Sequence, residues 1–134
     1  MDKKMFCFQC EQTVGCAGCT GNAGVCGKKA DTARLQDELT GALIGLARAV
    51  DSTTAISKRT GQVIIEGLFT TVTNVNFDDV SIENMIQKVR AEKERLVPDC
   101  SKCQSSCGNT DEYDMQQLWN ANEDIRSLKS LILF

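Results

Sequence analysis

The sequence predicts an all-α protein in which an N-terminal loop rich in cysteine and glycine precedes a bundle of helices. Within the first thirty residues, glycine recurs at every third position from Gly15 to Gly27, a spacing typical of a tightly bending chain. Beyond this loop, apolar residues recur at intervals of three and four, as on one face of an amphipathic helix. We therefore divide the chain into a loop, a three-helix bundle and the opening of a further helical region. These cover residues 1–30, 31–96 and 97–134 of one structural domain.

The first predicted helix follows the loop directly. Asp31 or Thr32 is a suitable N-cap, because a short polar side chain can accept a hydrogen bond from the free N–H groups of the first turn. An apolar stripe then recurs at helical spacing, at Leu35, Leu39, Leu43, Leu46 and Val50. Gly41 and Gly45 lie four residues apart on this helix, which would let another backbone approach it closely.

The second predicted helix covers about 58–73. We expect its inner face to consist of Ile64, Leu68, Thr71 and Val75. Gly67 lies in the middle of this helix, where glycine costs about 1 kcal/mol relative to alanine. A glycine retained at that position indicates a tight contact with a neighbouring element.

The third predicted helix starts at Ser81, or just before it at Asp78, and runs to about Leu96. Pro98 ends this helix, because proline disfavours a helical conformation in the residue before it. Its inward stripe is Ile82, Met85, Ile86 and Val89. Three amphipathic helices joined by short polar links are typical of a three-helix bundle.

The last part of the chain begins with a second cysteine-containing loop over 97–110. A short helix is predicted over 111–119, and another begins at Asn122 or Glu123. The chain closes on the apolar run 131–134, with no glycine or polar turn to end the helix. We expect the chain to be the front part of a longer polypeptide. The family resemblance described below implies that these helices open a second, truncated bundle.

Composition argues against several classes of protein. The net charge is −3 without a basic face, so nucleic acid is not an expected partner. No apolar run approaches the roughly 18 residues of a membrane span, and the N-terminus does not resemble a secretory signal. We therefore expect a cytoplasmic protein, in which clustered cysteines bind metal or act in redox chemistry. The chain contains no histidine, which excludes mixed Cys/His metal sites and Cys–His nucleophile pairs formed within it.

Four of the eight cysteines form a C-x2-C-x8-C-x6-C set, namely Cys7, Cys10, Cys19 and Cys26. The close pair lets two thiolates reach one metal from a single turn, and the glycine-bearing gaps let the chain wrap around to present the others. Flanking lysines would offset the negative charge of such a group, namely Lys3, Lys4, Lys28 and Lys29. Spacing favours an iron–sulfur cluster. A four-cysteine zinc site, disulfides and free thiols remain alternatives.

The other cysteines are Cys16 and the C-x2-C-x3-C run Cys100, Cys103 and Cys107. The run would form a second site if Cys16 completed it. Its spacing also resembles, weakly, the three-cysteine motif of enzymes whose 4Fe–4S cluster leaves one iron open. We prefer the interpretation that these thiols are inert or vary among related proteins. If they are exposed, a thiol redox sensor is another function that they permit.

Longer stretches of the sequence resemble the hybrid cluster proteins, also called prismane proteins or hydroxylamine reductases. The resemblance covers nearly the whole chain and is most specific at its N-terminal end. It rests on MFCFQCEQT, GCT at 18–20, GVCGK at 24–28, DTARLQDELTGALIGLA, LFTTVTNVNFD at 68–78, CGNTDEYDM at 107–115 and NEDIRSLKSLILF at 122–134. It implies that Cys7, Cys10, Cys19 and Cys26 are the ligands of the family's N-terminal iron–sulfur cluster, which would make residues 1–30 a cluster-binding loop. Cys16 and the later run lie outside this motif.

The resemblance also implies a cofactor and a function. In that family a short gap between the second and third ligands goes with a 4Fe–4S cluster, so the gap here favours 4Fe–4S over 2Fe–2S. The family's catalytic hybrid cluster is held by His, Glu and Cys residues in later domains, which are absent from this chain. The resemblance therefore implies the electron-transfer module of an oxidoreductase that reduces small N–O species such as hydroxylamine or nitric oxide.

No catalytic residue is expected within this chain, and the chain alone is not expected to be catalytically competent. The expected partners are a redox partner protein and the C-terminal catalytic domains of the same polypeptide. The alternative functions are a helical binding module stabilised by zinc or an iron–sulfur cluster, and a thiol redox sensor.

Overall fold

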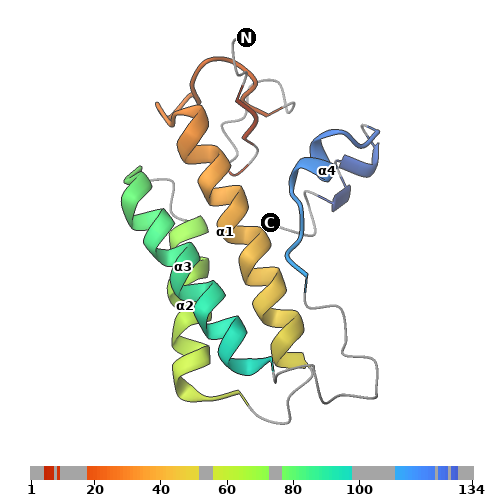
Figure 1. The fold of residues 1–134 in the computed structure, drawn as a ribbon. Helices are drawn as coiled ribbons and strands as arrows, with labels where there is room; N and C mark the ends of the chain where they lie inside the picture. Colours follow the sequence, from red (N-terminus) through yellow and green to blue (C-terminus); the bar gives the residue numbers. More distant parts are fainter. Residues whose placement is uncertain are drawn as a thin grey trace.

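The computed structural model describes residues 5–7, 9, 18–51, 56–72, 77–97, 111–122, 124–126 and 128–129. Its helices are, in order, α1 (Ala30–Asp51), α2 (Lys58–Val72), α3 (Asp79–Leu96) and the single turn α4 (Gln116–Trp119). Figure 1 shows α1, α2 and α3 side by side, with the N-terminal loop at the start of α1 and α4 on the other side of α1. The described residues contain no β-strand beyond two isolated bridges in the loop, which confirms the all-α class.

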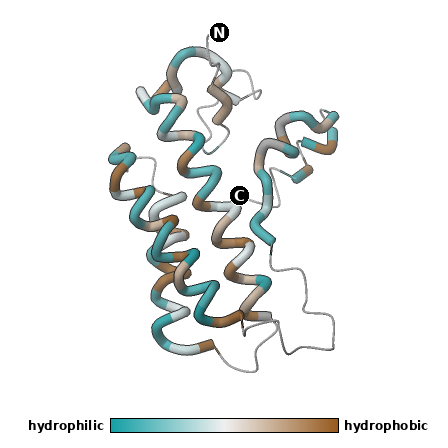
Figure 2. Tube along the Cα trace, in the orientation of Figure 1, coloured by the Kyte–Doolittle hydropathy of each residue, from teal (hydrophilic) through white to brown (hydrophobic). Residues whose placement is uncertain are grey.

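The core of the bundle lies between α1, α2 and α3. It is built from Leu35, Leu39, Ala42, Leu43, Leu46, Val63, Ile82, Met85, Ile86 and Val89. The apolar stripes predicted for the first and third helices are therefore confirmed, although Val50 is only partly buried. Each of the three helices carries both apolar and polar residues along its length, as amphipathic helices do (Figure 2). Among the described residues, none of the helices is both long and apolar enough to cross a membrane.

The start of α1 differs from the prediction. The helix begins at Ala30, so Asp31 and Thr32 lie inside its first turn and neither is the N-cap. The physical reason is that the carbonyl oxygen of Lys29 already accepts a helical hydrogen bond from Ala33 N–H, at 3.0 Å. The Thr32 hydroxyl instead donates to Asp79 Oδ1 at 2.6 Å, which ties the first turn of α1 to that of α3.

The ends of α3 agree with the sequence. Asp78 is the N-cap, and its side chain accepts a hydrogen bond from Val80 N–H at 3.1 Å. The Ser81 hydroxyl donates to the same carboxylate at 2.5 Å. The helix ends at Leu96 as predicted, while Pro98 lies outside the described residues.

The predicted inner face of α2 is wrong in its second half. Leu68 is 49% exposed, Thr71 is half-buried and Val75 lies outside the described residues. The buried positions are instead Thr60, Val63 and Gly67. Because Gly67 has no side chain, Leu43 of α1 packs against its backbone, and a Cβ at Gly67 would lie 2.7 Å from Leu43 Cδ2. The tight contact predicted at this glycine is confirmed, and it turns Leu68 outward.

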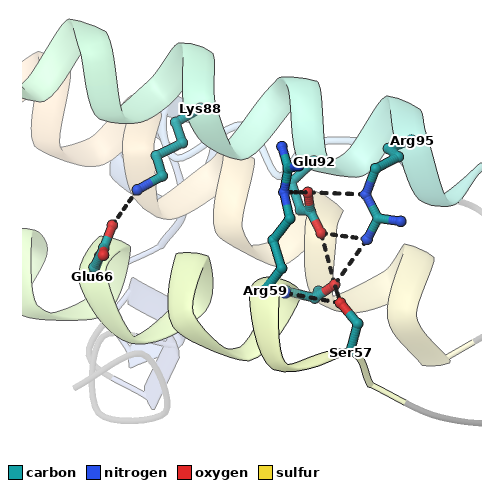
Figure 3. Close-up of polar contacts among 7 residues, drawn as sticks. Ser57, Arg59, Glu66, Lys88, Glu92 and Arg95 are labelled. Atoms are coloured by element: carbon teal, nitrogen blue, oxygen red, sulfur yellow. Dashed lines mark hydrogen bonds and ion pairs between the residues drawn. The ribbon is translucent and has the colours of Figure 1, made fainter.

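A buried carboxylate joins α2 to α3 (Figure 3). It lies near the C-terminal end of α3, which is far from the N-terminal loop (Figure 1). Glu92 is 1% exposed and accepts hydrogen bonds from the Thr60 hydroxyl at 2.7 Å and from Arg95 at 2.6 Å. Arg59 lies 3.1 Å from the same carboxylate. The hydrogen bonds from Arg95 and Thr60, with the charges of both arginines, outweigh the effect of burial and lower the pKa of Glu92 to about 2.

The segment after the second cysteine-containing loop is less helical than predicted. Only its end forms α4, because residues 111–115 run along α1 in a non-helical conformation. The Tyr113 N–H donates to the carbonyl oxygen of Gly41 at 3.3 Å, which confirms the close approach predicted at that glycine. Residues 124–126 are helical, and Arg126 N–H donates to Asn122 O at 2.9 Å, as expected for a helix that begins near Asn122. The run 131–134 lies outside the described residues.

Candidate metal centre in the N-terminal loop

Two of the four predicted ligands are paired through their backbones. Cys7 N–H donates to Cys19 O at 3.0 Å, and Cys19 N–H donates to Cys7 O at 2.7 Å. Residues that exchange both hydrogen bonds in this way have Cα atoms about 5.5 Å apart and side chains on the same face. Gly18 makes the pairing possible, because its φ is +85° and a Cβ there would lie 3.1 Å from Cys7 O. The backbone therefore brings these two thiols together.

Cys26, the third predicted ligand among the described residues, lies on a separate tight turn. Gly27 N–H donates to Gly24 O at 2.9 Å, and Gly24 N–H donates to Lys28 O at 2.8 Å. Gly27 has a φ of +85°, a conformation that glycine adopts without strain. The side chain of Cys26 is exposed at this turn.

The remaining cysteines, Cys10, Cys16, Cys100, Cys103 and Cys107, fall outside the described residues. Within the part of the chain that the structure describes, no three His, Cys, Asp or Glu side chains are grouped as for a metal ion. The structure thus brings Cys7 and Cys19 together and does not bring Cys26 into a three-residue group with them.

A buried lysine, Lys28, lies directly beside the paired cysteines. Its side chain is 1% exposed. The ammonium donates to Gln9 Oε1 at 2.7 Å and to Gln36 Oε1 at 2.5 Å, and lies 3.8 Å from Cys7 Sγ. These three contacts match the three N–H donors of a lysine ammonium. Burying an ammonium is costly unless it is paired with negative charge, so its position next to a thiol matters for the chemistry of that thiol.

Opposing influences act on the Cys7 thiol. Burial raises its pKa, and this effect exceeds the lowering by the Gln9 backbone N–H and by the charge of Lys28. The free thiol is therefore held in its protonated form. Both donors nevertheless favour negative charge on this sulfur, which is the charge that the sulfur acquires when a metal replaces its proton.

A second ionisable group, Asp37, is buried close to Lys28. Its side chain is 8% exposed, and its Oδ2 has no hydrogen-bond partner in the described part of the chain. Burial raises the pKa of Asp37 from its ordinary value of 3.8 to about 7, and the charge of Lys28 opposes this rise. The sequence prediction missed both Gln36 and Asp37. The available signal was that these polar residues occupy the helix turn between the buried Leu35 and Leu39.

Apolar and aromatic contacts surround the paired cysteines. Met5, Cys19 and Ala33 form a small buried apolar group that is separate from the core of the bundle. The guanidinium of Arg126 lies 5.7 Å from the centroid of the Phe6 ring, a distance at which a cation–π interaction is favourable. The helical residues after Asn122 therefore reach back to the loop.

The described residues fit an anionic thiolate-ligated group. Cys7 and Cys19 are paired on one short ladder, and one of the two sulfurs receives a backbone N–H and lies beside a buried ammonium. Iron–sulfur clusters held by thiolates are anionic, and hydrogen bonds to their sulfurs stabilise the negative charge. The pairing and the buried cation are compatible with such a group.

The fold and the site together define a class, an all-α protein with a thiol-bearing N-terminal loop suited to an anionic metal group. A family model described as the Prismane/CO dehydrogenase family matches residues 5–134, and the chain belongs to this family. This membership confirms the resemblance found in the sequence.

Curated relatives of this chain carry the name hydroxylamine reductase. The protein of Clostridium perfringens is 36% identical over 97% of this chain and 27% of its own length. That of Maridesulfovibrio salexigens is 35% identical over 97% of this chain and 27% of its own length. That of Methanocella arvoryzae is 46% identical over 69% of this chain and 17% of its own length. The chain thus spans about a quarter of the length of the first two relatives.

Proposed function

We propose that this chain is the N-terminal iron–sulfur electron-transfer module of an oxidoreductase of the hydroxylamine reductase type. Cys7, Cys10, Cys19 and Cys26 hold one 4Fe–4S cluster in this proposal, and none of the chain's residues is catalytic. The observation that carries the proposal is the backbone pairing of Cys7 and Cys19 beside the buried ammonium of Lys28. A buried cation at a cysteine sulfur argues against inert thiols. A zinc ion held by four thiolates would also be anionic, so the C-x8-C-x6 spacing favours iron–sulfur over zinc, and the metal analysis below distinguishes the two.

The chain's own residues have distinct parts in this function. A bound iron–sulfur cluster supplies a reversible one-electron change. The bridge between Cys7 and Cys19 fixes the spacing of two ligand sulfurs before any metal arrives. Gln9 N–H and the Lys28 ammonium stabilise negative charge at the Cys7 sulfur. The apolar group around Met5 excludes water from one side of the pair.

The proposal extends to the longer protein that the relatives represent. The aligned relatives named hydroxylamine reductase are about four times as long as the matched region, and in this proposal the bond-breaking chemistry belongs to the part beyond it. A redox partner protein would deliver electrons to the N-terminal cluster, which would pass them to that catalytic part. Hydroxylamine and nitric oxide are the small N–O substrates that we propose, and the cytoplasm is the proposed compartment.

Metal analysis of anaerobically purified protein tests the proposal. We expect a brown protein with about four irons and four acid-labile sulfides per chain, and an EPR signal that appears on reduction. Stoichiometric zinc without sulfide, in a colourless protein, would overturn the proposal and favour the metal-stabilised binding module.

Two serine variants identify the ligands. Cys19→Ser changes one atom at a buried position and should abolish iron and sulfide binding. Cys16→Ser is the matched control within the same loop and should leave both contents unchanged. Full cluster content in Cys19→Ser would exclude Cys19 as a ligand, and loss of the cluster in Cys16→Ser would show that the ligand set has been assigned incorrectly.

A further inference from the structure

We propose that Lys28 is a positioning residue that donates a hydrogen bond to the Cys7 ligand sulfur and thereby raises the reduction potential of the cluster. This inference rests on the proposed function, because it requires Cys7 to ligate an iron–sulfur cluster. It goes beyond that function by assigning control of the potential to one side chain.

The first step is that Lys28 is buried although its neighbour Lys29 is not. The two lysines are adjacent and carry the same charge, yet Lys28 is 1% exposed whereas Lys29 is exposed to solvent. Lysine is almost never fully buried unless its charge is paired. A specific partner must therefore offset the cost of burying Lys28, and Lys29 needs none.

The second step is the identity of that partner. Two of the three groups around the ammonium are the neutral amide oxygens of Gln9 and Gln36, at 2.7 and 2.5 Å. The third is Cys7 Sγ at 3.8 Å, within the longer range of hydrogen bonds to sulfur. Of these three acceptors, only the sulfur can carry a full negative charge. The other acid nearby, Asp37, attracts Lys28 by its charge, but no hydrogen bond or ion pair joins these two side chains among the described residues, so Cys7 is the acidic group that the ammonium contacts directly.

The third step is that two hydrogen bonds hold the Lys28 ammonium in position beside the Cys7 sulfur. Gln36 projects from α1 and is completely buried, so one of the two amides that orient the ammonium belongs to a rigid helix. Gln9 belongs to the same segment as Cys7, and its amide oxygen accepts a second hydrogen bond from the Lys28 ammonium. With two of its N–H groups held by these amides, Lys28 has one N–H left for the sulfur.

The sign of the effect follows from electrostatics. Reduction adds one negative charge to the cluster, and a fixed positive charge beside a ligand sulfur stabilises the reduced state more than the oxidised state. Removing the charge of Lys28 should therefore shift the potential to a more negative value. Removing the charge of Lys29 should shift it much less, because solvent and salt screen an exposed ammonium.

A redox titration of the full chain, loaded anaerobically with its cluster, tests the inference. The reduction potential is measured by EPR for the unaltered protein, Lys28→Met and Lys29→Met. We expect a clear negative shift in Lys28→Met and a potential close to that of the unaltered protein in Lys29→Met. Equal potentials in the two variants would overturn the inference while leaving the proposed function intact.

A second measurement covers the case in which Lys28→Met fails to fold or to retain its cluster. The unaltered chain is labelled with nitrogen-15 lysine, and pulsed EPR of the reduced cluster looks for a coupled lysine nitrogen. We expect that coupling in the unaltered protein and in Lys29→Met, and its absence overturns the assignment of Lys28. A failure of the proposed function is separate, because the unaltered protein would then contain no iron and sulfide.

Discussion

The main chain at Tyr113 lies against the backbone of Gly41. The Tyr113 N–H donates to Gly41 O at 3.3 Å, and the Tyr113 carbonyl oxygen occupies the place where a side chain at position 41 would begin. At this point two segments more than seventy residues apart in the sequence meet through backbone atoms, and the Arg48 guanidinium of α1 also donates to Asp111 O at 2.9 Å. These contacts fix the path of residues 111–115 along α1 and so the approach of the following segment to the N-terminal loop.

Substitution of Gly41 by alanine should destabilise the protein. Alanine favours a helix by about 1 kcal/mol over glycine, but overpacking at a closed contact costs about 1–3 kcal/mol, and backbone atoms cannot yield as a flexible side chain can. We expect a net loss of stability, measured by chemical denaturation. Gly61→Ala is the matched control, because a Cβ there meets nothing closer than 4.0 Å, and it should stabilise α2. A Gly41→Ala protein as stable as Gly61→Ala would contradict the contact.

Substitution of Glu92 by glutamine tests the buried network between α2 and α3. The change keeps the size of the side chain and removes the charge that Arg95 and Arg59 face. Charge-assisted hydrogen bonds are worth about 1.5–3 kcal/mol, and we expect a loss of that order in the free energy of unfolding. Glu66→Gln is the control, because Glu66 forms an exposed ion pair with Lys88 (Figure 3), and exposed pairs contribute little. Equal effects of the two substitutions would show that burial of Glu92 gives it no special weight.

The same carboxylate predicts part of the acid sensitivity. Its pKa is about 2 in the folded protein and 4.5 ordinarily, so the unfolded chain binds a proton at higher pH than the folded protein does. The stability that Glu92 contributes is complete above pH 4.5 and is lost as the pH falls toward 2. Denaturation at several pH values should show a shallower decline in this window for Glu92→Gln than for the unaltered protein. Identical slopes would contradict the lowered pKa.

Asp37 predicts a pH dependence of opposite sign. Its pKa is raised from 3.8 to about 7, so the folded protein holds a proton that the unfolded chain has released. The stability contributed by the protonated carboxyl is complete below pH 3.8 and is lost as the pH rises through about 7.

Asp37→Asn should therefore stabilise the metal-free chain at pH 8, by on the order of 2–4 kcal/mol, and change its stability little at pH 3.5. Lys28, Cys7 and Cys19 are unchanged in this variant, so the comparison isolates the Asp37 carboxyl. An asparagine variant that is less stable than the unaltered chain at pH 8 would show that Asp37 acts as an anion in the folded protein.

Removal of metal should leave the helical bundle folded. The core of α1, α2 and α3 shares no described residue with the small apolar group around Cys19, so the two can be lost independently. After chelation under reducing conditions, we expect far-ultraviolet circular dichroism to retain most of its helical signal. Loss of most of that signal would favour a domain that metal binding folds.

The sequence predicted best those features that depend on local pattern. The apolar stripe of α3 and its cap at Asp78 follow from periodicity and side-chain chemistry within a single turn. The same stripe, extended by one turn, reaches Glu92, so the buried carboxylate could have been found by its position. The inner face of α2 could not be found in this way, because it depends on Leu43 of another helix entering the space at Gly67.

The residues that surround the candidate site could be identified only from the three-dimensional structure. From the sequence, any of the flanking lysines could offset the charge of a bound group. Only the folded structure shows that Lys28 is buried whereas Lys29 is exposed. The position of Gln36 between Leu35 and Leu39 indicates closeness to the core, but the sequence does not indicate that Gln36 contacts Lys28. Long-range partners of this kind are set by packing, which local periodicity does not encode.

The backbone bridge between Cys7 and Cys19 affects how much the amino-acid sequence of this loop can change during evolution. Its hydrogen bonds join main-chain groups that every residue other than proline carries. Replacement of most neighbouring side chains would therefore leave the distance between the two sulfurs unaltered, and Gly18 is the exception because a Cβ there would press against the bridge. The geometry of the thiol pair therefore depends on main-chain groups that most substitutions leave in place, so the exposed side chains of the loop can change in evolution while the two sulfurs keep their separation.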